Sequence, residues 1–341
     1  MTVPIRVGIM GFGRIGRNIF RQVHECDDIQ IVAISDLSEP EALAYALEYD
    51  TIYGGFPGKV QLDGKYLLAG RQRARLLKGT RPDEMPWDLF EVDVVIEATS
   101  SFRHRADLQG HLDSGARRVI LSTPALDSID RTVLHGINHD RLVPEDRIIS
   151  CSSATTVALG LILKILDDAV GVRRATMTTV HAYSSDQKLA DTVAENPRRS
   201  RSAAENLIPN WTWAPSVIEQ VLPQLAGKIG GMAVNVPVPN GSNLDLVTQM
   251  STPVSPEDVN AAVREAARNR YSPWVEFTDE PLVSRDVIGN PHSAVFDSLA
   301  TIAVHGNLVK TITWYDNGWG YAARIVETVR TLATLDSGGP A

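Results

Sequence analysis

Cysteine is scarce in this sequence: Cys26 and Cys151 are the only two among 341 residues. Two cysteines cannot form the disulfide framework that staples small secreted domains, so we expect a reducing compartment. Although 43% of the residues are hydrophobic, no apolar run is long enough to span a membrane. The N-terminus is interrupted by glycine and arginine and lacks the apolar core of a secretory signal. These absences together predict a cytoplasmic protein.

An excess of positive charge is also absent. The chain has 33 Lys and Arg residues against 41 Asp and Glu residues, a net charge of −8, and no long basic run. Nucleic acids and anionic membranes attract clustered positive charge, so we expect neither as the main partner. The length is sufficient for two domains, and no internal repeat divides it further. We expect a small-molecule substrate and no metal site.

The stretch from Arg147 to Asp167 organises the chain. It has the pattern of a strand end, a polar turn and then a long apolar helix. A helix start presents unpaired backbone N–H groups and a partial positive charge, which can lower the pKa of a nucleophile or hold an oxyanion. The turn is therefore a candidate reactive site. Its hydroxyl side chains are Ser150, Ser152, Ser153, Thr155 and Thr156.

A glycine-rich turn near the N-terminus predicts a dinucleotide site. Residues 5–9 have the pattern of a buried strand, and the expected helix covers Ile15 to Cys26. Gly11, Gly13 and Gly16 have the spacing G-x-G-x-x-G. Glycine permits the tight turn and lets the backbone approach a pyrophosphate at the helix start. The alternative interpretation is a glycine turn that packs the helix on the sheet and binds no ligand.

A carboxylate at the next strand end favours NAD over NADP. A second strand is expected over Gln30 to Ile34, and Asp36 follows it, 20 residues after Gly16. A carboxylate at this distance can hydrogen-bond the hydroxyls of a ribose. Its negative charge would repel a 2′-phosphate. The sequence therefore predicts NAD as the cofactor.

Two further strand ends carry hydroxyl side chains. Thr99 follows an apolar strand expected over 92–98, and Ser122 follows one expected over 118–121. In open parallel sheets the carboxyl ends of the strands face the ligand crevice. Thr99 and Ser122 are therefore candidates for cofactor contacts, with ordinary turn and capping chemistry as an equal alternative.

The second half of the chain has a different pattern. From Arg174 onward, polar and apolar residues alternate over long segments, which predicts a half-buried mixed or antiparallel sheet. A polar, arginine-rich loop over 191–202 interrupts it. The last helix is expected over Gly320 to Leu335 and is long enough to return to the first domain.

Seven segments carry a family pattern in their order and spacing. They are VGIMGFGRIGR (7–17), IISCSSATT (148–156), TTVHAYSSDQ (178–187), RRSRSAAENLIP (198–209), VPVPNGS (236–242), EPLVSRD (280–286) and WYDNGWGY (314–321). Through them the chain resembles glyceraldehyde-3-phosphate dehydrogenase along essentially its whole length. The resemblance implies an α/β fold, NAD, a homotetramer and an extended loop near 183–205.

The same resemblance implies the domain organisation. An N-terminal Rossmann domain with a doubly wound sheet, residues 1–152, is expected to bind NAD. An α+β catalytic domain with a mixed or antiparallel sheet, residues 153–319, is expected to bind the substrate. The C-terminal helix, residues 320–341, is expected to return to the NAD-binding domain.

The resemblance also reveals a difference at the nucleophile. The family's signature is S-N-A-S-C-T-T-N, and alignment on Thr155 and Thr156 places Ala154 at the catalytic cysteine. A methyl group cannot form the family's covalent thiol intermediate. Cys151, three residues earlier, is either a replacement nucleophile or, more simply, a buried and inert thiol. Ser153 and Thr155 match the neighbours of the nucleophile and are expected to face the substrate.

Other functional positions are retained. His181 matches the family's catalytic base, and imidazole, which titrates near neutrality, suits proton transfer. On the residues alone, a core histidine on a strand is the alternative. Asn317 matches the residue that orients the nicotinamide carboxamide. Arg14 and Ile15 match the backbone donors to the pyrophosphate.

The phosphate-binding positions are altered. Ser184 stands for a threonine of the family and Asn235 for an arginine, so the bidentate clamp for a dianion is lost. The family's Thr-Gly pair is here Thr212 and Trp213, and we expect the tryptophan to fill part of the phosphate site. Arg199 either retains the second anion-site arginine or is a solvated or subunit-facing loop charge.

Three functions are consistent with these residues. The first is an NAD-dependent oxidoreductase with an altered substrate site, outside glycolysis, that uses His181 and no thiol. In the second, Ala154 is an engineered Cys-to-Ala change in a thiol-dependent aldehyde dehydrogenase. The third is a non-redox enzyme or an NAD-binding regulatory protein on the same scaffold. Because Ala154, Val157, Trp213 and Asn235 all differ from the family, we expect an altered function, and the cofactor turn favours the first.

Overall fold

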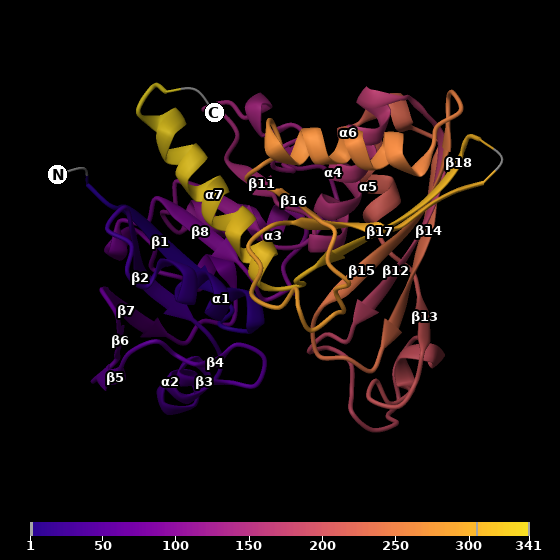
Figure 1. Ribbon diagram of the computed structural model, residues 1–341. Helices are drawn as coiled ribbons and strands as arrows, with labels where there is room; N and C mark the ends of the chain where they lie inside the picture. Colours follow the sequence, from indigo (N-terminus) through magenta and orange to yellow (C-terminus); the bar gives the residue numbers. More distant parts are fainter. Residues whose placement is uncertain (1–2, 305, 340–341) are drawn as a thin grey trace. The chain divides into compact units, whose positions relative to one another are not determined.

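The computed structural model describes residues 3–304 and 306–339, which form two compact units. Unit 1 falls within residues 1–133, 138–152 and 322–341. Unit 2 falls within residues 134–137 and 153–321. Figure 1 shows a strand-and-helix layer structure in each unit. The predicted α/β class, with a doubly wound sheet followed by a mixed sheet, is confirmed.

Unit 1 is built on one sheet with the strand order β10-β11-β9-β8-β1-β2-β7-β6-β5. All pairs from β10 to β7 are parallel, and β5 and β6 continue the sheet antiparallel. The strands are β1 (Ile5–Met10), β2 (Ile29–Ser35), β5 (Val60–Asp63), β6 (Tyr66–Ala69), β7 (Gln72–Leu77), β8 (Val94–Glu97), β9 (Arg118–Leu121), β10 (Arg131–Thr132) and β11 (Ile148–Ser150). The helices are α1 (Arg14–Val23), α2 (Pro40–Glu48) and α3 (Arg105–Asp113), and a two-stranded ribbon joins β3 (Tyr49–Asp50) and β4 (Gly54–Gly55).

The central strands of unit 1 are short and almost wholly apolar because both faces of the sheet are covered. Val7, Ile9, Ile31 and Ile96 are each exposed by no more than 1%. The helix expected over 15–26 begins one residue earlier and ends at Val23, where the Cys26 N–H donates to the Val23 carbonyl in a turn.

Unit 2 is built on a mixed sheet with the order β13-β14-β12-β15-β18-β17-β16. The pairs β12–β14 and β16–β17 are parallel and the others are antiparallel. The strands are β12 (Val172–Ala182), β13 (Ile208–Asn210), β14 (Ile229–Val236), β15 (Ser242–Met250), β16 (Val275–Thr278), β17 (Ala294–Val304) and β18 (Leu308–Tyr315). The helices α4 (Ala154–Ala169), α5 (Ala214–Val221) and α6 (Pro256–Arg268) pack on this sheet, as Figure 1 shows.

Helix α4 is the centre of the core of unit 2. From Val157 to Leu163 its sequence is apolar on all sides, which is typical of a buried helix segment. Leu159, Leu161 and Ile162 are completely buried and share one cluster with Leu244 and Phe296 of the sheet. Burial of this segment on every side fixes the axis of α4, so that its first residues are held at one place in unit 2.

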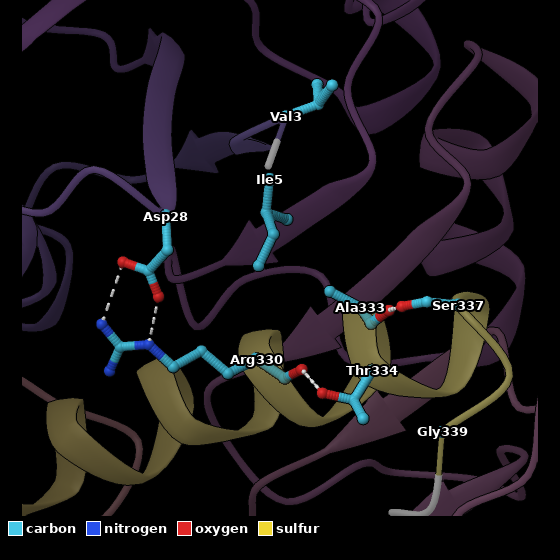
Figure 2. A pocket seen from close by; sticks show the side chains of 8 residues that line it. All are labelled: Val3, Ile5, Asp28, Arg330, Ala333, Thr334, Ser337 and Gly339. Carbon is cyan, nitrogen blue, oxygen red and sulfur yellow. Dashed lines mark hydrogen bonds and ion pairs between the residues drawn. The ribbon is translucent and has the colours of Figure 1, made fainter. Parts of the chain in front are cut away.

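The last helix, α7 (Trp319–Asp336), belongs to unit 1 from Ala322 onward. Ile325, Val329 and Leu332 of α7 are buried there, at 1% exposure or less. Figure 2 shows a shallow surface pocket beside it, where Arg330 pairs with Asp28 (Nε to Oδ2, 2.6 Å). The C-terminal segment therefore completes the unit that the N-terminal segment begins.

Candidate functional site

The glycine turn of unit 1 lies between β1 and α1. Gly11 has φ +94°, and a Cβ there would lie 2.7 Å from the Thr99 nitrogen. A Cβ at Gly16 would lie 2.4 Å from the Gly11 carbonyl oxygen. Gly13 is exposed, and a Cβ there would meet nothing within 4 Å. Glycine is thus required at two positions by the fold, whereas the space beside Gly13 is open to a ligand.

The start of α1 suits an anion. Gly13 is the N-cap residue and no side chain caps the helix, and its first turn carries no acidic residue. The N–H groups of Arg14 and Ile15 lie at this uncapped end. Because a helix N-terminus combines free donors with a partial positive charge, a pyrophosphate fits here.

Asp36 ties the glycine turn to the end of β2. Its Oδ2 accepts the Phe12 N–H (2.8 Å), and its Oδ1 accepts the Ser38 N–H (3.0 Å). The side chain is half-buried. A carboxylate has about four acceptor positions, so both oxygens retain capacity for ribose hydroxyls.

Thr99 and Ser122 lie at the ends of β8 and β9, as expected. The Thr99 hydroxyl donates to Glu97 and accepts the Ser101 N–H (3.1 Å). Ser122 is 6% exposed, and its N–H donates to the Glu97 carbonyl (3.0 Å). Thr99 thus has turn partners, and a cofactor contact of either residue stays a prediction.

In unit 2, the start of α4 is capped by a side chain. The Ser153 hydroxyl accepts the Thr156 N–H (3.2 Å) and lies 2.8 Å from the Thr156 hydroxyl. Ala154 is the first residue of the helix and is half-buried. The chain passes from unit 1 to unit 2 between Ser152 and Ser153.

Cys151 belongs to unit 1. It is 1% exposed, and its sulfur lies 3.3 Å from the hydroxyl of Thr328 in α7. Burial raises the pKa of the Cys151 thiol to about 12. Since the thiolate is the nucleophilic form, this cysteine is unreactive near neutral pH.

His181 lies near the end of β12, beside Asn235 on the parallel strand β14. Its Nδ1 is 2.6 Å from the Ala182 carbonyl oxygen, which can only accept. Nδ1 therefore carries the proton of the neutral ring. The Asn317 amide nitrogen is nearly equidistant from the two ring nitrogens, 3.3 Å from Nδ1 and 3.2 Å from Nε2. This tautomer leaves Nε2 as the basic atom.

A network of hydroxyl groups continues from Asn317. The Asn317 Oδ1 accepts the Ser242 hydroxyl (2.7 Å). The Tyr315 hydroxyl lies 2.7 Å from the hydroxyls of both Thr155 and Thr179. Burial raises the pKa of Tyr315, and its hydrogen bonds to Thr155, Thr179 and Ser242 oppose the shift only in part. Tyr315 is therefore neutral and holds the start of α4 in place.

Tyr315, Thr179 and Ser242 were missed by the sequence analysis. Tyr315 on β18 is paired with Ser242 on β15, and Thr179 is on β12. Only the WYDN segment offered a signal, because it places Tyr315 two residues before Asn317. Hydroxyl contacts between three strands have no mark in a single sequence.

The loop after β12 brings two predicted substrate residues together. The Asp186 carboxylate accepts hydrogen bonds from the Ser184 hydroxyl and from the Arg199 guanidinium. Arg199 is half-buried, in the short 3₁₀ turn Pro197–Ser200. Its charge is thus already paired with a carboxylate of the same loop.

The remaining predicted residues lie on β14 and after β13. Asn235 is 6% exposed, and its Oδ1 accepts from the Asn210 amide (3.4 Å). The Thr212 hydroxyl accepts the Ala214 N–H at the start of α5 (3.3 Å). Trp213 is 39% exposed, and its ring meets Trp211 edge-on with 4.3 Å between centroids. Whether Trp213 fills a phosphate site stays a prediction.

Comparison with known proteins gives the family. Residues 5–105 match the model of the glyceraldehyde 3-phosphate dehydrogenase NAD binding domain, and residues 150–317 match that of the C-terminal domain. The chain belongs to the glyceraldehyde-3-phosphate dehydrogenase family. It is 41% identical to the enzyme of Priestia megaterium over 97% of this chain and 99% of the relative. It is 42% identical to glyceraldehyde-3-phosphate dehydrogenase 2 of Streptomyces avermitilis (95% and 97%) and to the Mycobacterium avium enzyme (96% and 98%).

Family membership confirms the predicted cofactor and the class of reaction. The chain is an NAD-binding oxidoreductase of the glyceraldehyde-3-phosphate dehydrogenase type with a small-molecule substrate, and NAD is its cofactor. Among residues 3–304 and 306–339, no helix has the length and apolar content needed to cross a membrane. In the same residues, no three His, Cys, Asp or Glu side chains group to hold a metal ion.

Proposed function

We propose that this member of the family has no nucleophilic thiol and is an NAD-dependent oxidoreductase with an altered substrate site, outside glycolysis. The observation that carries the proposal is the start of α4. Ala154 is the first residue of this helix; Ser153 before it caps the helix, and the hydroxyl of Thr155 after it contacts Tyr315. A methyl group there cannot attack an aldehyde, so the phosphorylating oxidation of the family is not expected.

Cys151 does not replace the missing thiol. Its sulfur is buried against Thr328, and its pKa of about 12 leaves almost no thiolate near neutrality. Activated cysteines instead lie at helix N-termini or beside cations. This position has neither feature.

The substrate proposed is less anionic than a triose phosphate. The arginine expected from the family is replaced by Asn235, next to His181 in the sheet. The charge of Arg199 is paired with Asp186. A phosphate dianion would lack the bidentate clamp and would have to compete with a carboxylate for the arginine that remains. The exposed Trp211–Trp213 pair instead offers aromatic surface.

His181 is the proposed acid–base residue. With Nδ1–H bonded to the Ala182 carbonyl, its Nε2 can take the proton of a substrate hydroxyl or amine. NAD, held by the glycine turn, Asp36 and the start of α1, supplies a hydride acceptor when it is bound. The Asn317 amide nitrogen lies 3.2 Å from Nε2 of His181. Oxidation of a secondary alcohol or amine needs these groups and no thiol.

The proposal divides the chain by task. Residues 1–152 and the returning helix 320–341 bind NAD, and residues 153–319 carry the substrate chemistry. We also propose a homotetramer in the cytoplasm. Exposed apolar side chains on the strands of unit 2 support self-association: Met232 on β14, Leu299, Ile302 and Val304 on β17, and Leu308 on β18.

The decisive experiment compares the natural protein with Ala154→Cys. Both are assayed for NAD reduction with glyceraldehyde 3-phosphate and inorganic phosphate, and with a panel of uncharged secondary alcohols and amines. We expect no triose phosphate oxidation by the natural protein and a gain of it in Ala154→Cys. Adding His181→Asn to that variant should lower its rate by about 10²–10⁴-fold, because proton transfer is lost.

Brisk oxidation of triose phosphate by the natural protein would contradict the proposal. Cys151→Ser serves as the control, because it removes the other nearby thiol. If that substitution abolished such activity, Cys151 would be the nucleophile.

A further inference from the structure

A buried row of hydrogen bonds in unit 1 has no part in the proposed chemistry. Trp87 Nε1 donates to His111 Nδ1 (3.0 Å), and His111 Nε2 lies 3.1 Å from Glu97 Oε2. The side chains of Trp87, His111 and Glu97 are all fully buried. Burial of a polar group costs free energy unless the group is hydrogen-bonded. Each of these atoms must therefore face a complementary partner, and this requirement identifies the donors and the acceptors.

The protonation of this row follows from its first member. An indole nitrogen can only donate, so His111 Nδ1 must carry a lone pair. The proton of the neutral imidazole is then on Nε2, and it points at the Glu97 carboxylate. A doubly protonated ring would place its Nδ1–H against the indole N–H. Donation therefore runs in one direction, from Trp87 through His111 to Glu97.

The second oxygen of Glu97 holds the turn that follows β8. Oε1 accepts the Thr99 N–H (2.8 Å) and also the Thr99 hydroxyl. The next residue, Ser100, has φ +66°, a left-handed conformation that is unfavourable for serine. The carboxylate therefore stabilises a strained turn from its buried side.

The glycine turn rests on this segment. A Cβ at Gly11 would lie 2.7 Å from both the Thr99 nitrogen and the Ala98 carbonyl carbon. The Ala98 N–H also donates to the Met10 carbonyl (2.7 Å). Because backbone touches backbone here, a displacement of Thr99 must displace Gly11.

We propose that Glu97 is a positioning residue for NAD. Its carboxylate, oriented by His111 and Trp87, fixes the turn against which Gly11 packs, and so fixes the pyrophosphate-binding turn. The inference rests on the assignment of NAD to the glycine turn. It does not depend on Ala154 or on the identity of the substrate, because it concerns binding and not turnover.

Three substitutions in the full chain test this role. Glu97→Gln places an amide N–H against at least one donor in either orientation. His111→Leu removes the bond to Glu97. His111→Gln retains it, because the glutamine amide can accept from Trp87 and donate to Glu97. Each protein is compared by the dissociation constant for NAD from calorimetry and by its thermal stability.

We expect Glu97→Gln and His111→Leu to weaken NAD binding by about tenfold or more, the value of one buried charged hydrogen bond. His111→Gln should stay within about threefold of the natural protein. Gln72→Leu is the matched control. Gln72 is 3% exposed in the same unit, and its side chain makes hydrogen bonds to three backbone groups, those of Val23, Ile29 and Ile31, that are not part of the turn. This substitution should lower thermal stability without weakening the binding of NAD.

Natural affinity in folded Glu97→Gln and His111→Leu would overturn the inference. So would equal weakening by Gln72→Leu, because the effect would then be general destabilisation. Failure of His111→Gln to restore binding would show that the imidazole matters for its shape and not for its hydrogen bonds.

Discussion

Two residues three positions apart, Cys151 and Ala154, show how the surroundings of a side chain decide its chemistry. Ala154 opens helix α4, where backbone N–H groups would stabilise a thiolate. Cys151 is three residues earlier in a buried position, and its pKa is about 12. At neutral pH such a thiol is ionised in roughly one molecule in 10⁵. A cysteine is present in this segment, but it lacks the environment of a nucleophile.

The reactivity of Cys151 can be measured with a thiol reagent. At pH 8 we expect one fast thiol in the natural protein, the partly exposed Cys26, and a second only after unfolding. Ala154→Cys should add a fast thiol, and Cys26→Ser should remove the first. Rapid labelling of two thiols in the folded natural protein would contradict the assignment.

The same thiol makes stability depend on pH. Its pKa is raised on folding from 9.0 to about 12, so the neutral form is favoured in the folded state. The resulting stabilisation is complete below pH 9 and is lost as the pH rises toward 12. In this window the free energy of unfolding of the natural protein should fall relative to Cys151→Ser by about 1.4 kcal/mol per pH unit. Denaturant titrations at several pH values measure this difference.

At the scale of elements, the turns at the strand ends carry the strain of the fold. Ser100 and Ser152 both have φ near +60°, one after β8 and the other after β11. Each turn lies beside a predicted site. Such conformations persist where the surrounding structure imposes them, here the hydrogen bonds of Glu97 and Ser150.

Ser100→Gly should stabilise unit 1. The left-handed conformation costs a non-glycine residue about 1–2 kcal/mol, more than the entropic cost of glycine, about 0.5–1 kcal/mol. We expect the free energy of unfolding to rise by about 0.5–1 kcal/mol, measured by denaturant titration. Ser101→Gly is the control, because Ser101 is also exposed but has an ordinary φ, and it should lower stability. The same sign for both substitutions would refute the argument from strain.

At the scale of the whole molecule, the two ends of the chain meet in one unit. Residues from Ala322 onward pack with the segment that begins at β1, and Cys151 contacts Thr328 in that helix. Arg118 also pairs with Asp336. Unit 1 therefore cannot complete its core until the last residues of the chain are present.

Leu332→Ala should destabilise unit 1 strongly. Leu332 is fully buried, and removal of such a side chain typically costs about 2–5 kcal/mol. Arg330→Met is the matched control two residues away. It breaks the partly exposed pair with Asp28, worth about 0–1 kcal/mol, and a weak contact with the Cys26 sulfur. A urea titration in which NAD binding is monitored reports the stability of unit 1. Equal losses of stability in both variants would show that α7 is held by its ion pairs and not by its apolar face.

Much of the fold was predictable from local pattern. The glycine turn, β1, β2 and the helix after residue 153 depend on spacings within about 30 residues, which periodicity and glycine positions reveal. The mixed sheet followed from alternation in the second half. The contacts of Tyr315 were not predictable, because they join a helix start and two strands that are far apart in the chain.

The sequence by itself determined the cofactor turn, the capped start of α4, the acid at Asp36 and the presence of alanine at position 154, since these are properties of residue order. Only the tertiary structure decided that Cys151 is buried against Thr328, 177 residues away, and that Glu97 receives its hydrogen bonds from Thr99 and from His111 on α3. The physical reason is desolvation. The ionisation of a thiol and the partners of a buried carboxylate depend on what excludes water from them, and that is supplied by distant parts of the chain.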